Sequence, residues 1–204
     1  MDVCEKEACI SNDRHFEIRK ELFRKSIHML SAAVPFLLYL AYWPVISLLS
    51  SVVVVYVVSE IARLHGKKIP VISMITTFAA RERDKNKFVL GPVTLACGII
   101  AAALMWKGEC ACIGIFALAF GDGSASLAGK LYGRVEVPFT EGKTVAGSLT
   151  CFFAIFVSSF IVCRNPSASL ILAGAGMIIE ILPLRDFDNL IIPVAIGGLA
   201  FLIL

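Results

Sequence analysis

Long runs of apolar residues alternate with short polar segments along the whole chain. We place the seven runs at about residues 27–42, 44–62, 88–106, 110–128, 145–163, 167–183 and 189–204. A helix needs about 20 mostly apolar residues to cross a bilayer core of about 30 Å, and the runs approach this length. They are continuously apolar, whereas strands of a membrane β-barrel would alternate apolar and polar residues. The pattern therefore predicts an all-α, polytopic transmembrane bundle with about seven transmembrane helices.

The polar connections predict how the helices follow one another. Only a Trp43-Pro44 turn divides the first two runs, and only Lys107-Gly108-Glu109 divides the third from the fourth, so both pairs are expected to be tight hairpins. We expect residues 1–26 to form a separate N-terminal segment and residues 27–204 a single transmembrane domain. Residues 69–80 are moderately apolar, and they fit either a short interfacial helix or a plain connector.

Composition supports lipid as the solvent, and charge predicts the orientation. The chain is 58% hydrophobic and 17% charged, against about 45–50% apolar and about 25% charged in soluble domains. Of the 19 Lys and Arg residues, all but Lys107 and Arg164 lie in the N-terminal segment or in the connections after the second, fourth and sixth runs. Cytoplasmic loops collect Lys and Arg. The N-terminus is therefore expected in the cytoplasm and the C-terminus outside.

The same distribution limits the partners and the redox chemistry. The basic residues show no patch interleaved with aromatic residues, so no nucleic-acid partner is expected. The seven cysteines are odd in number, and most lie in or beside apolar runs. We expect them to act as small hydrophobic residues rather than as a disulfide framework.

The polar stretch richest in chemistry begins where the fourth run ends. Residues 120–134 read Phe-Gly-Asp-Gly-Ser-Ala-Ser-Leu-Ala-Gly-Lys-Leu-Tyr-Gly-Arg, and Lys143-Thr-Val-Ala-Gly147 follows. Glycine lets a ligand or a backbone approach closely. Cations suit phosphate, and an acid nearby suits Mg²⁺, which takes one or two carboxylates together with phosphate oxygens. On a helix, Ser126, Lys130 and Arg134 would share one face, so the stretch predicts a phosphate site beside Asp122.

Familiar phosphate motifs do not describe this stretch. A P-loop has four residues between its first glycine and Gly-Lys, and then Ser or Thr. Here five residues separate Gly123 from Gly129, and Leu131 follows Lys130. A structural alternative stays open, in which the small residues serve tight helix packing. That alternative leaves Asp122 unexplained, because a carboxylate at membrane depth is costly unless it is paired or bound to a metal.

Further ionisable residues are expected on the same side of the membrane. Glu17, Glu21, Arg24, Lys25 and His28 recur at spacings of three and four, so they share a helical face. His28 already lies inside an apolar run, where it is either a packing residue or a functional one.

The last polar group surrounds the turn before the seventh run. Glu180 lies in the sixth run, and Asp186 and Asp188 lie in the turn that follows it. A bundle can bring this turn to Asp122, although one aspartate can instead cap the last helix. Glu60 and Arg63 either pair with each other or join this site.

These residues resemble the CTP-dependent polyprenol kinases, a family that includes dolichol kinase, phytol kinase and the yeast-type diacylglycerol kinase and that is related to phosphatidate cytidylyltransferase. The matching segments keep their order over nearly the whole chain. They are Arg24-Lys25-Ser-Ile-His28, Glu60-Ile-Ala-Arg63, Gly121-Asp-Gly-Ser-Ala through Gly129-Lys-Leu-Tyr-Gly-Arg134, Lys143-Thr-Val-Ala-Gly147, and Glu180 through Asp188-Asn189 with Pro193. The His-Gly-Gly and Asp-Arg elements of the cytidylyltransferases are missing. The chain resembles the C-terminal catalytic part of the longer dolichol kinases.

The resemblance implies transfer of the γ-phosphoryl group of CTP to the hydroxyl of a membrane lipid alcohol at the cytoplasmic face, with 27–204 as the catalytic domain. The implied catalytic residues are Asp122, His28 and Asp188, and the implied Mg²⁺ ligands are Asp122 and Asp188. The implied nucleotide and phosphate contacts are Gly121, Gly123, Ser124, Ser126, Lys130, Arg134, Lys143, Thr144 and Gly147. The implied supporting residues are Arg24, Lys25, Glu60, Arg63, Glu180 and Asn189.

Several alternatives remain open at this point. Phytol, geranylgeraniol, a longer polyprenol and diacylglycerol all fit as the acceptor, and the oligomeric state is not specified. A cytidylyltransferase-like enzyme that forms a CDP-lipid is the nearest alternative function. A small-solute transporter is an alternative of another class, but it would place polar residues at mid-membrane on several helices, whereas here they gather at one boundary.

Overall fold

The computed structural model describes residues 18–66, 87–138, 140 and 142–204, and most of them are helical. An N-terminal helix covers residues 18–30 and continues through the 3-10 turn η1 (Ser31–Ala33) into α2 (Val34–Leu40). The next helices are α3 (Tyr42–Leu64) and α5 (Gly91–Met105). A single rod then comprises α6 (Glu109–Phe116), the π-helical η3 (Ala117–Asp122) and α7 (Gly123–Tyr132). The last are α8 (Val145–Cys163), α9 (Pro166–Ile181), η4 (Arg185–Phe187) and α10 (Asp188–Ile203).

This architecture confirms the all-α, polytopic prediction. Each of the seven apolar runs forms a helix or a helical rod in the described residues. Four of the described helical stretches are long and apolar enough to cross a membrane: Tyr42–Leu64, Glu109–Tyr132, Val145–Cys163 and Arg185–Ile203. Gly91–Met105 and Pro166–Ile181 are apolar but shorter. The exact number of spans and the orientation of the termini stay predictions.

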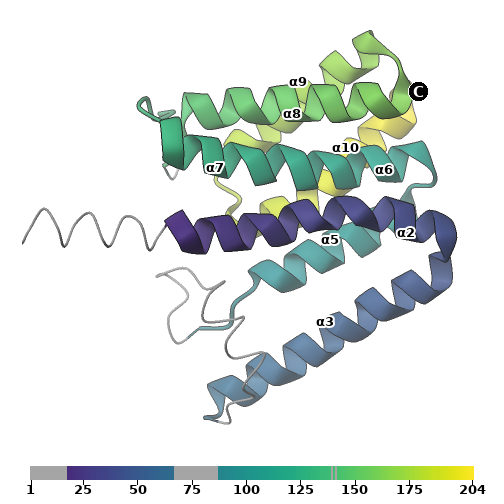
Figure 1. Ribbon diagram of the computed structural model, residues 1–204, viewed down its shortest axis with the longest axis vertical. Coiled ribbons are helices and arrows are strands. Elements are labelled where there is room, and N and C mark those ends of the chain that lie inside the picture. The colour runs from purple at the N-terminus through teal and green to yellow at the C-terminus, as the bar shows by residue number, and fades with distance from the viewer. Residues whose placement is uncertain (1–17, 67–86, 139, 141) are drawn as a thin grey trace, which may run out of the picture.

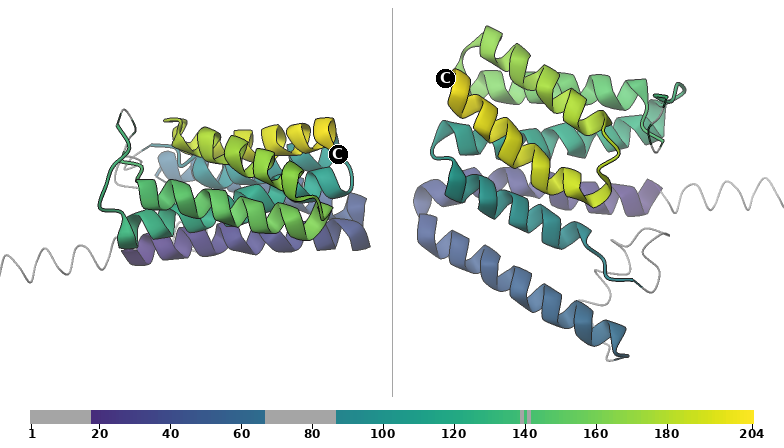
Figure 2. Two further views of the ribbon diagram at one scale, coloured as in Figure 1. Left: turned by 90° about the horizontal axis from the view of Figure 1, so that it is seen from above. Right: turned by 180° about the vertical axis from the view of Figure 1, so that it is seen from behind.

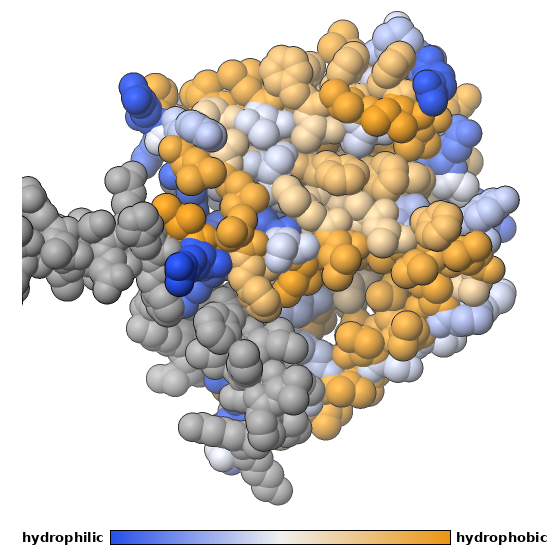
Figure 3. All heavy atoms as spheres, in the orientation of Figure 1, coloured by the Kyte–Doolittle hydropathy of each residue, from blue (hydrophilic) through white to orange (hydrophobic). Residues whose placement is uncertain are grey.

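The helices form a bundle in which α10 is central and α3 is peripheral. α10 packs against α5, α6 and α9, and α8 packs against α7 and α9. Figure 2 shows α10, in yellow, crossing α5 and α6. Among the named helices that the structure describes, α3 packs mainly against α5 and α2, and it leans away from the other helices in Figure 1. In Figure 3 the visible face is largely apolar along the helices, with hydrophilic side chains mainly toward their ends.

The core is aliphatic, and glycines let helices approach α10 closely. Ile113, Leu118, Ile155, Leu172 and Ile196 are fully buried. A Cβ atom at Gly98 of α5 would lie 2.2 Å from the carbonyl oxygen of Asn189. At Gly114 of α6 it would lie 2.2 Å from the carbonyl oxygen of Pro193. These contacts fix the N-terminal half of α10, which carries Asp188 and Asn189.

Three boundary predictions need correction or remain open. The first hairpin turns at Ala41 (φ −153°, ψ 78°) rather than at Trp43-Pro44, because proline fits within the first turn of α3. The second hairpin lies at Lys107-Gly108 as expected, with Gly108 at φ 60°. Residues 18–26 belong to the same helix as residues 27–30, and the division of the chain after residue 26 stays a prediction. Residues 69–80 lie outside the described residues.

Gly114→Ala is expected to lower the free energy of unfolding by about 1–3 kcal/mol, the usual cost of overpacking. The added methyl group would meet backbone atoms of α10, which cannot rotate away. Thermal unfolding in detergent measures this effect. Gly174→Ala in α9 is the matched control, because a Cβ there meets nothing within 4 Å. Equal unfolding temperatures for the two variants would contradict the close contact.

Candidate active site

Two adjoining cavities lie where the N-terminal helix, the end of η3 and the start of α10 meet. The polar cavity has a volume of about 230 Å³ and the apolar cavity about 410 Å³. The charged lining residues of the polar cavity are Glu21, Arg24, Lys25, Asp122, Lys130, Lys143, Glu180 and Asp188. The apolar cavity is lined mainly by the N-terminal helix, α3 and α5. Both cavities share Arg24, Lys25, Asp122 and Asp188, so these residues form a common wall.

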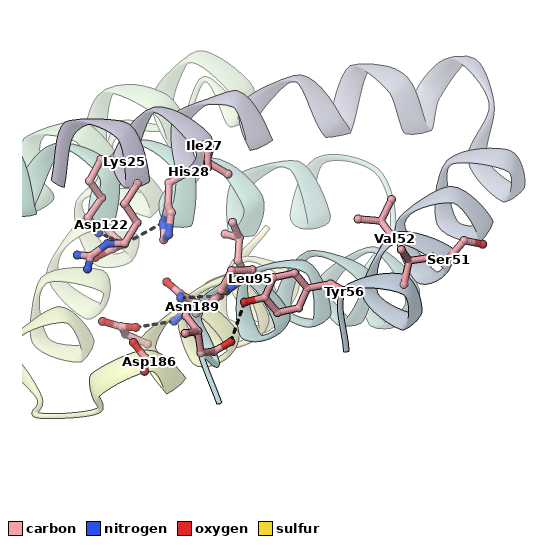
Figure 4. A pocket seen from close by; sticks show the side chains of 16 residues that line it. Lys25, Ile27, His28, Ser51, Val52, Tyr56, Leu95, Asp122, Asp186 and Asn189 are labelled. Carbon is pink, nitrogen blue, oxygen red and sulfur yellow. Dashed lines mark hydrogen bonds and ion pairs between the residues drawn. The ribbon is translucent and has the colours of Figure 1, made fainter. Parts of the chain in front are cut away.

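The centre of the common wall is a buried ion pair. Lys25 Nζ donates to Asp122 Oδ2 at 2.5 Å, and both side chains are less than one tenth exposed. His28 Nδ1 lies 3.1 Å from the same oxygen, close enough for an ion pair, but within the described structure this nitrogen lacks a partner with hydrogen-bond geometry. Figure 4 shows Lys25 and His28 both directed at Asp122. A buried charge is tolerated only when it is paired, so Lys25 is what allows Asp122 to be ionised here.

The local backbone also sets the position of Asp122. It is the last residue of the π-helical segment η3. A π-helical turn contains one more residue than an α-helical turn, and such turns are frequent at functional sites. The additional residue rotates the side chains of α7 about the axis of the rod relative to those of α6. Asp122 lies at the end of this π-helical segment, where it contacts Lys25 and His28 of the N-terminal helix.

Glu21 connects the N-terminal helix to α7. Its carboxylate accepts from Ser126 Oγ at 2.5 Å and pairs with Arg24 at 2.6 Å and with Lys130 at 3.0 Å. Burial alone would raise the pKa of Glu21, but Arg24, Lys25, the Ser126 hydroxyl and Lys130 lower it to about 2 from 4.5. Glu21 is thus ionised at any physiological pH.

Lys143 and the start of α8 also line the polar cavity. Lys143 Nζ lies 3.4 Å from Glu180 Oε1 and also donates to the backbone carbonyl of Glu180. Ser148 Oγ donates to Glu180 Oε2 at 3.3 Å. Thr144 caps α8 by accepting from Gly147 N at 3.2 Å, and both residues line the cavity. A helix N-terminus and a lysine together form a favourable position for an anion.

Most of the predicted site residues lie around these cavities. Ser126, Lys130, Lys143, Thr144, Gly147 and Glu180 line the polar cavity, His28 and Asn189 line the apolar one, and Arg24, Lys25, Asp122 and Asp188 line both. Asn189 Nδ2 donates to Thr94 Oγ1 at 3.2 Å, which ties α10 to α5.

Other predicted residues have structural positions instead. A Cβ at Gly121 would lie 2.8 Å from Ile155, and a Cβ at Gly123 would lie 3.3 Å from Met29, so both glycines allow close packing. Ser124 Oγ donates to the carbonyl of Phe120 within its own helix. Glu60 and Arg63 pair with each other at 2.7 Å and line neither of the two cavities.

Two expectations about helix ends are wrong. α7 ends at Tyr132, so the exposed Arg134 does not share a helical face with Ser126 and Lys130. The reason lies at Gly133, which packs against Thr144 and leaves the helix. The N-cap of α10 is Phe187, with no side-chain cap. Asp188 is the first residue of α10, and its Oδ1 accepts from Asn189 N at 2.8 Å.

Sequence reasoning missed the central position of Glu21 and gave Lys25 only a supporting part. The available signal was the spacing of Glu21, Arg24, Lys25 and His28 on one helical face. That face identified neighbours within the helix, but it could not identify Ser126 or Asp122, which lie about 100 residues away in sequence.

The described acids do not form a metal cage by themselves. Among the described residues, no three His, Cys, Asp or Glu side chains lie close enough together to hold a metal ion. Mg²⁺ usually needs only one or two carboxylates when phosphates supply the other oxygens. Asp122 and Asp188 on the common wall fit that arrangement, although Asp122 Oδ2 is already in contact with Lys25 and His28.

The geometry defines a class of protein: a helical membrane protein with a charged cavity joined to an apolar one. No family model and no solved structure match the chain. Curated proteins do. A probable phytol kinase of Zea mays is 26% identical over 91% of this chain and 68% of its own length. Phytol kinase 1 of Arabidopsis thaliana is 25% identical over 87% of this chain and 65% of its own length.

A shorter match points in the same direction. The farnesol kinase of Arabidopsis thaliana is 29% identical over 39% of this chain and 27% of its own length. The chain spans about two thirds of the length of the phytol kinases that it matches. These comparisons confirm the resemblance to the polyprenol and phytol kinase family.

Lys25→Met is expected to cost about 3–5 kcal/mol of stability, because it leaves Asp122 as a buried charge without its cation. The double variant Lys25→Met/Asp122→Leu should recover most of that loss, since neither charge remains. Chemical unfolding in detergent, analysed as a double-mutant cycle, measures both effects. If the two single losses simply add in the double variant, the ion pair does not have this role.

The Glu21 carboxylate predicts an acid-sensitive contribution to stability. Its pKa is lower in the folded protein than the unfolded value of 4.5, so the contribution is complete above about pH 4.5 and is lost as the pH falls toward 2. The stability difference between the wild type and Glu21→Gln should therefore shrink between pH 6 and pH 3. The exposed Glu136→Gln serves as the control. A difference that does not change with pH would refute the assignment.

Proposed function

We propose that this chain transfers the γ-phosphoryl group of CTP to the hydroxyl of an isoprenoid-type lipid alcohol. The observation that carries the proposal is the junction of a charged cavity and an apolar cavity at Arg24, Lys25, Asp122 and Asp188. A water-soluble polyanion and a lipid hydroxyl can meet at such a wall. The relatives named phytol kinase and farnesol kinase support the same reaction class.

The polar cavity suits the donor. Phosphoryl transfer requires positioning and charge neutralisation more than covalent chemistry. Lys130 and Lys143 both line the cavity, each paired with a glutamate, and α8 begins two residues after Lys143. A triphosphate would compete with Glu21 and Glu180 for these two lysines. The glutamates thus keep the cations in place and balance their charge before the nucleotide binds.

The common wall suits the acceptor. A hydroxyl that reaches it from the apolar cavity would lie beside His28 and Asp122, which are 3.1 Å apart. In the transfer step, the alcohol oxygen forms a bond to the γ-phosphorus as the bond from that phosphorus to the β-phosphate oxygen breaks. The hydroxyl proton passes to His28 or to one of the acids. The products are a lipid monophosphate and CDP.

Mg²⁺ is part of the proposal, with Asp188 and Asp122 as its protein ligands. When bound together with the nucleotide, the ion would neutralise phosphate charge. Asp122 Oδ2 already contacts Lys25, and both aspartates lie on the common wall of the two cavities. The Lys and Arg distribution supports a site that faces the cytoplasm, where CTP is found.

Two other functions are distinguishable. A cytidylyltransferase would release the β- and γ-phosphates of CTP as pyrophosphate and retain the nucleotide on the lipid. A transporter would move a phosphorylated solute without forming a lipid phosphate. The names of the relatives favour the kinase over both.

The direct test uses purified protein in lipid nanodiscs with CTP labelled at the γ-phosphate. Phytol, farnesol, geranylgeraniol and diacylglycerol are offered in turn, and ATP replaces CTP in a parallel series. Label in the lipid fraction supports the kinase. Label in pyrophosphate identifies a cytidylyltransferase and overturns the proposal, as does the absence of transfer to any alcohol.

Asp188→Asn and Lys143→Met are each expected to lower the transfer rate by at least about a hundredfold, the usual effect of removing a group that stabilises transition-state charge. Lys107→Met is the control, since Lys107 lies in the connection between α5 and α6 at the opposite end of the bundle. Initial rates with labelled CTP measure the effect. If Asp188→Asn and Lys143→Met retain the control's activity, the polar cavity is not the donor site.

A further inference from the structure

The apolar cavity has the dimensions and lining of a small-molecule site. Its volume of about 410 Å³ lies within the usual range of about 300–1,000 Å³ for ligand pockets. Ile27 of the N-terminal helix, Val52 and Val55 of α3, and Leu95 of α5 supply apolar walls. Figure 4 shows Lys25, His28 and Asp122 on one side of this cavity and Ser51 and Val52 on the other, with Tyr56 between. The cavity thus has a charged end and an apolar end.

The apolar end opens sideways. Val52 and Val55 line the cavity, yet they are 55% and 56% exposed, and Ile27 is 37% exposed. These residues therefore form a rim on the outer surface of the bundle, between the N-terminal helix and α3. α3 is one of the helices long and apolar enough to cross a membrane. In a bilayer this rim would face the acyl chains and not the water.

A group of polar contacts fixes the α3 wall near the charged end. Tyr56 Oη donates to the carbonyl of Val89 at 3.1 Å, and Val89 N donates to Glu60 Oε1 at 2.9 Å. Arg63 holds Glu60 with two hydrogen bonds and donates to the carbonyl of Lys87 at 2.8 Å. We name these contacts of Tyr56, Glu60 and Arg63 with the backbone of residues 87 and 89 the α3 clasp. Tyr56 and Val89 also line the cavity.

The clasp adds polar contacts to the packing of α3. Among the named helices of the described part of the chain, α3 packs mainly against α5 and α2. Glu60 is only 1% exposed, so it is a buried acid whose partners are arranged to hold it. These contacts join α3 to the segment that leads into α5, at Tyr56 and Val89 in the cavity lining.

We propose that the apolar cavity receives the hydrocarbon tail of the acceptor lipid laterally, between the N-terminal helix and α3, and that the α3 clasp sets its width. This inference rests on the proposed function for the identity of the ligand as a lipid alcohol. The tail enters from the bilayer, and the hydroxyl stops at His28 and Asp122. Glu60 and Arg63 then act as positioning residues for the acceptor, not as donor contacts.

A second apolar cavity does not meet these conditions. It lies near the connection between α5 and α6 and includes Phe36, Trp43 and Phe116 in its lining. It shares no lining residue with the polar cavity. A lipid bound there could not present its hydroxyl to Asp122.

The test of the tail site needs no phosphoryl transfer. A long-chain prenyl alcohol carrying a diazirine in its tail is photolysed with the full chain in nanodiscs, without nucleotide, and the labelled peptides are sequenced. We expect label in residues 51–56 and 89–95, reduced by excess unlabelled alcohol. Label confined to residues around Phe36, Trp43 and Phe116, or spread evenly over the surface, overturns the inference. If label reaches the expected residues but no alcohol is ever phosphorylated, the tail site stands and the proposed function fails.

Variants of α3 provide the kinetic test. Val55→Trp should fill the cavity and raise the KM for the alcohol about tenfold, in the range reported for apolar pocket changes, while the KM for CTP stays within about twofold. Val54→Trp is the matched control, because Val54 is also exposed on α3 but does not line the cavity. Tyr56→Phe keeps the ring and removes the contact with Val89, so it should change the KM for the alcohol and not that for CTP. Equal effects of the two tryptophan variants, or parallel changes in both KM values with Tyr56→Phe, contradict the inference.

Discussion

The buried pair of Lys25 and Asp122 is the interaction on which the rest of the site depends. It joins the N-terminal helix to the end of η3, and both cavities are bounded by it. Without Lys25, a carboxylate at this depth would be too costly to remain ionised. Without Asp122, the N-terminal helix would bring a lysine into an apolar environment. The pair therefore explains why a charged site can exist inside an otherwise apolar bundle.

Around this pair, each basic side chain of the polar cavity forms an ion pair with an acidic one. Glu21 holds Arg24 and Lys130, and Glu180 holds Lys143. Such pairing keeps side chains oriented, and it makes the cavity nearly neutral. A polyanionic ligand would then replace the glutamates as the partner of these cations. The net binding free energy per contact would therefore be smaller than with an unpaired cation. Discrimination among ligands then depends on the shape of the polar cavity and on the apolar cavity beside it.

The sequence specified helices well because a long apolar run determines a helix locally. It also singled out Asp122, Lys130 and Lys143, which line one cavity, since acids and cations beside glycines are unusual at the end of an apolar run. It failed where a distant contact decides the local structure. α7 stops before Arg134 because Gly133 packs against Thr144. The π-helical turn before Asp122 leaves no mark in the spacing of apolar residues. The partners of Glu21 become visible only when α7 lies beside the N-terminal helix.

The N-terminal helix contributes side chains to both cavities within two turns. Glu21 and Lys130 meet on the polar side, and Ile27 lies on the apolar side, with Arg24 and Lys25 common to both. Any small rotation or shift of this one helix alters the two cavities together. If each of two ligands prefers one position of the helix, then each changes the affinity for the other. By thermodynamic linkage, the two factors are equal. The two substrates of such an enzyme would not bind independently, and the coupling free energy between them would measure how freely this helix moves.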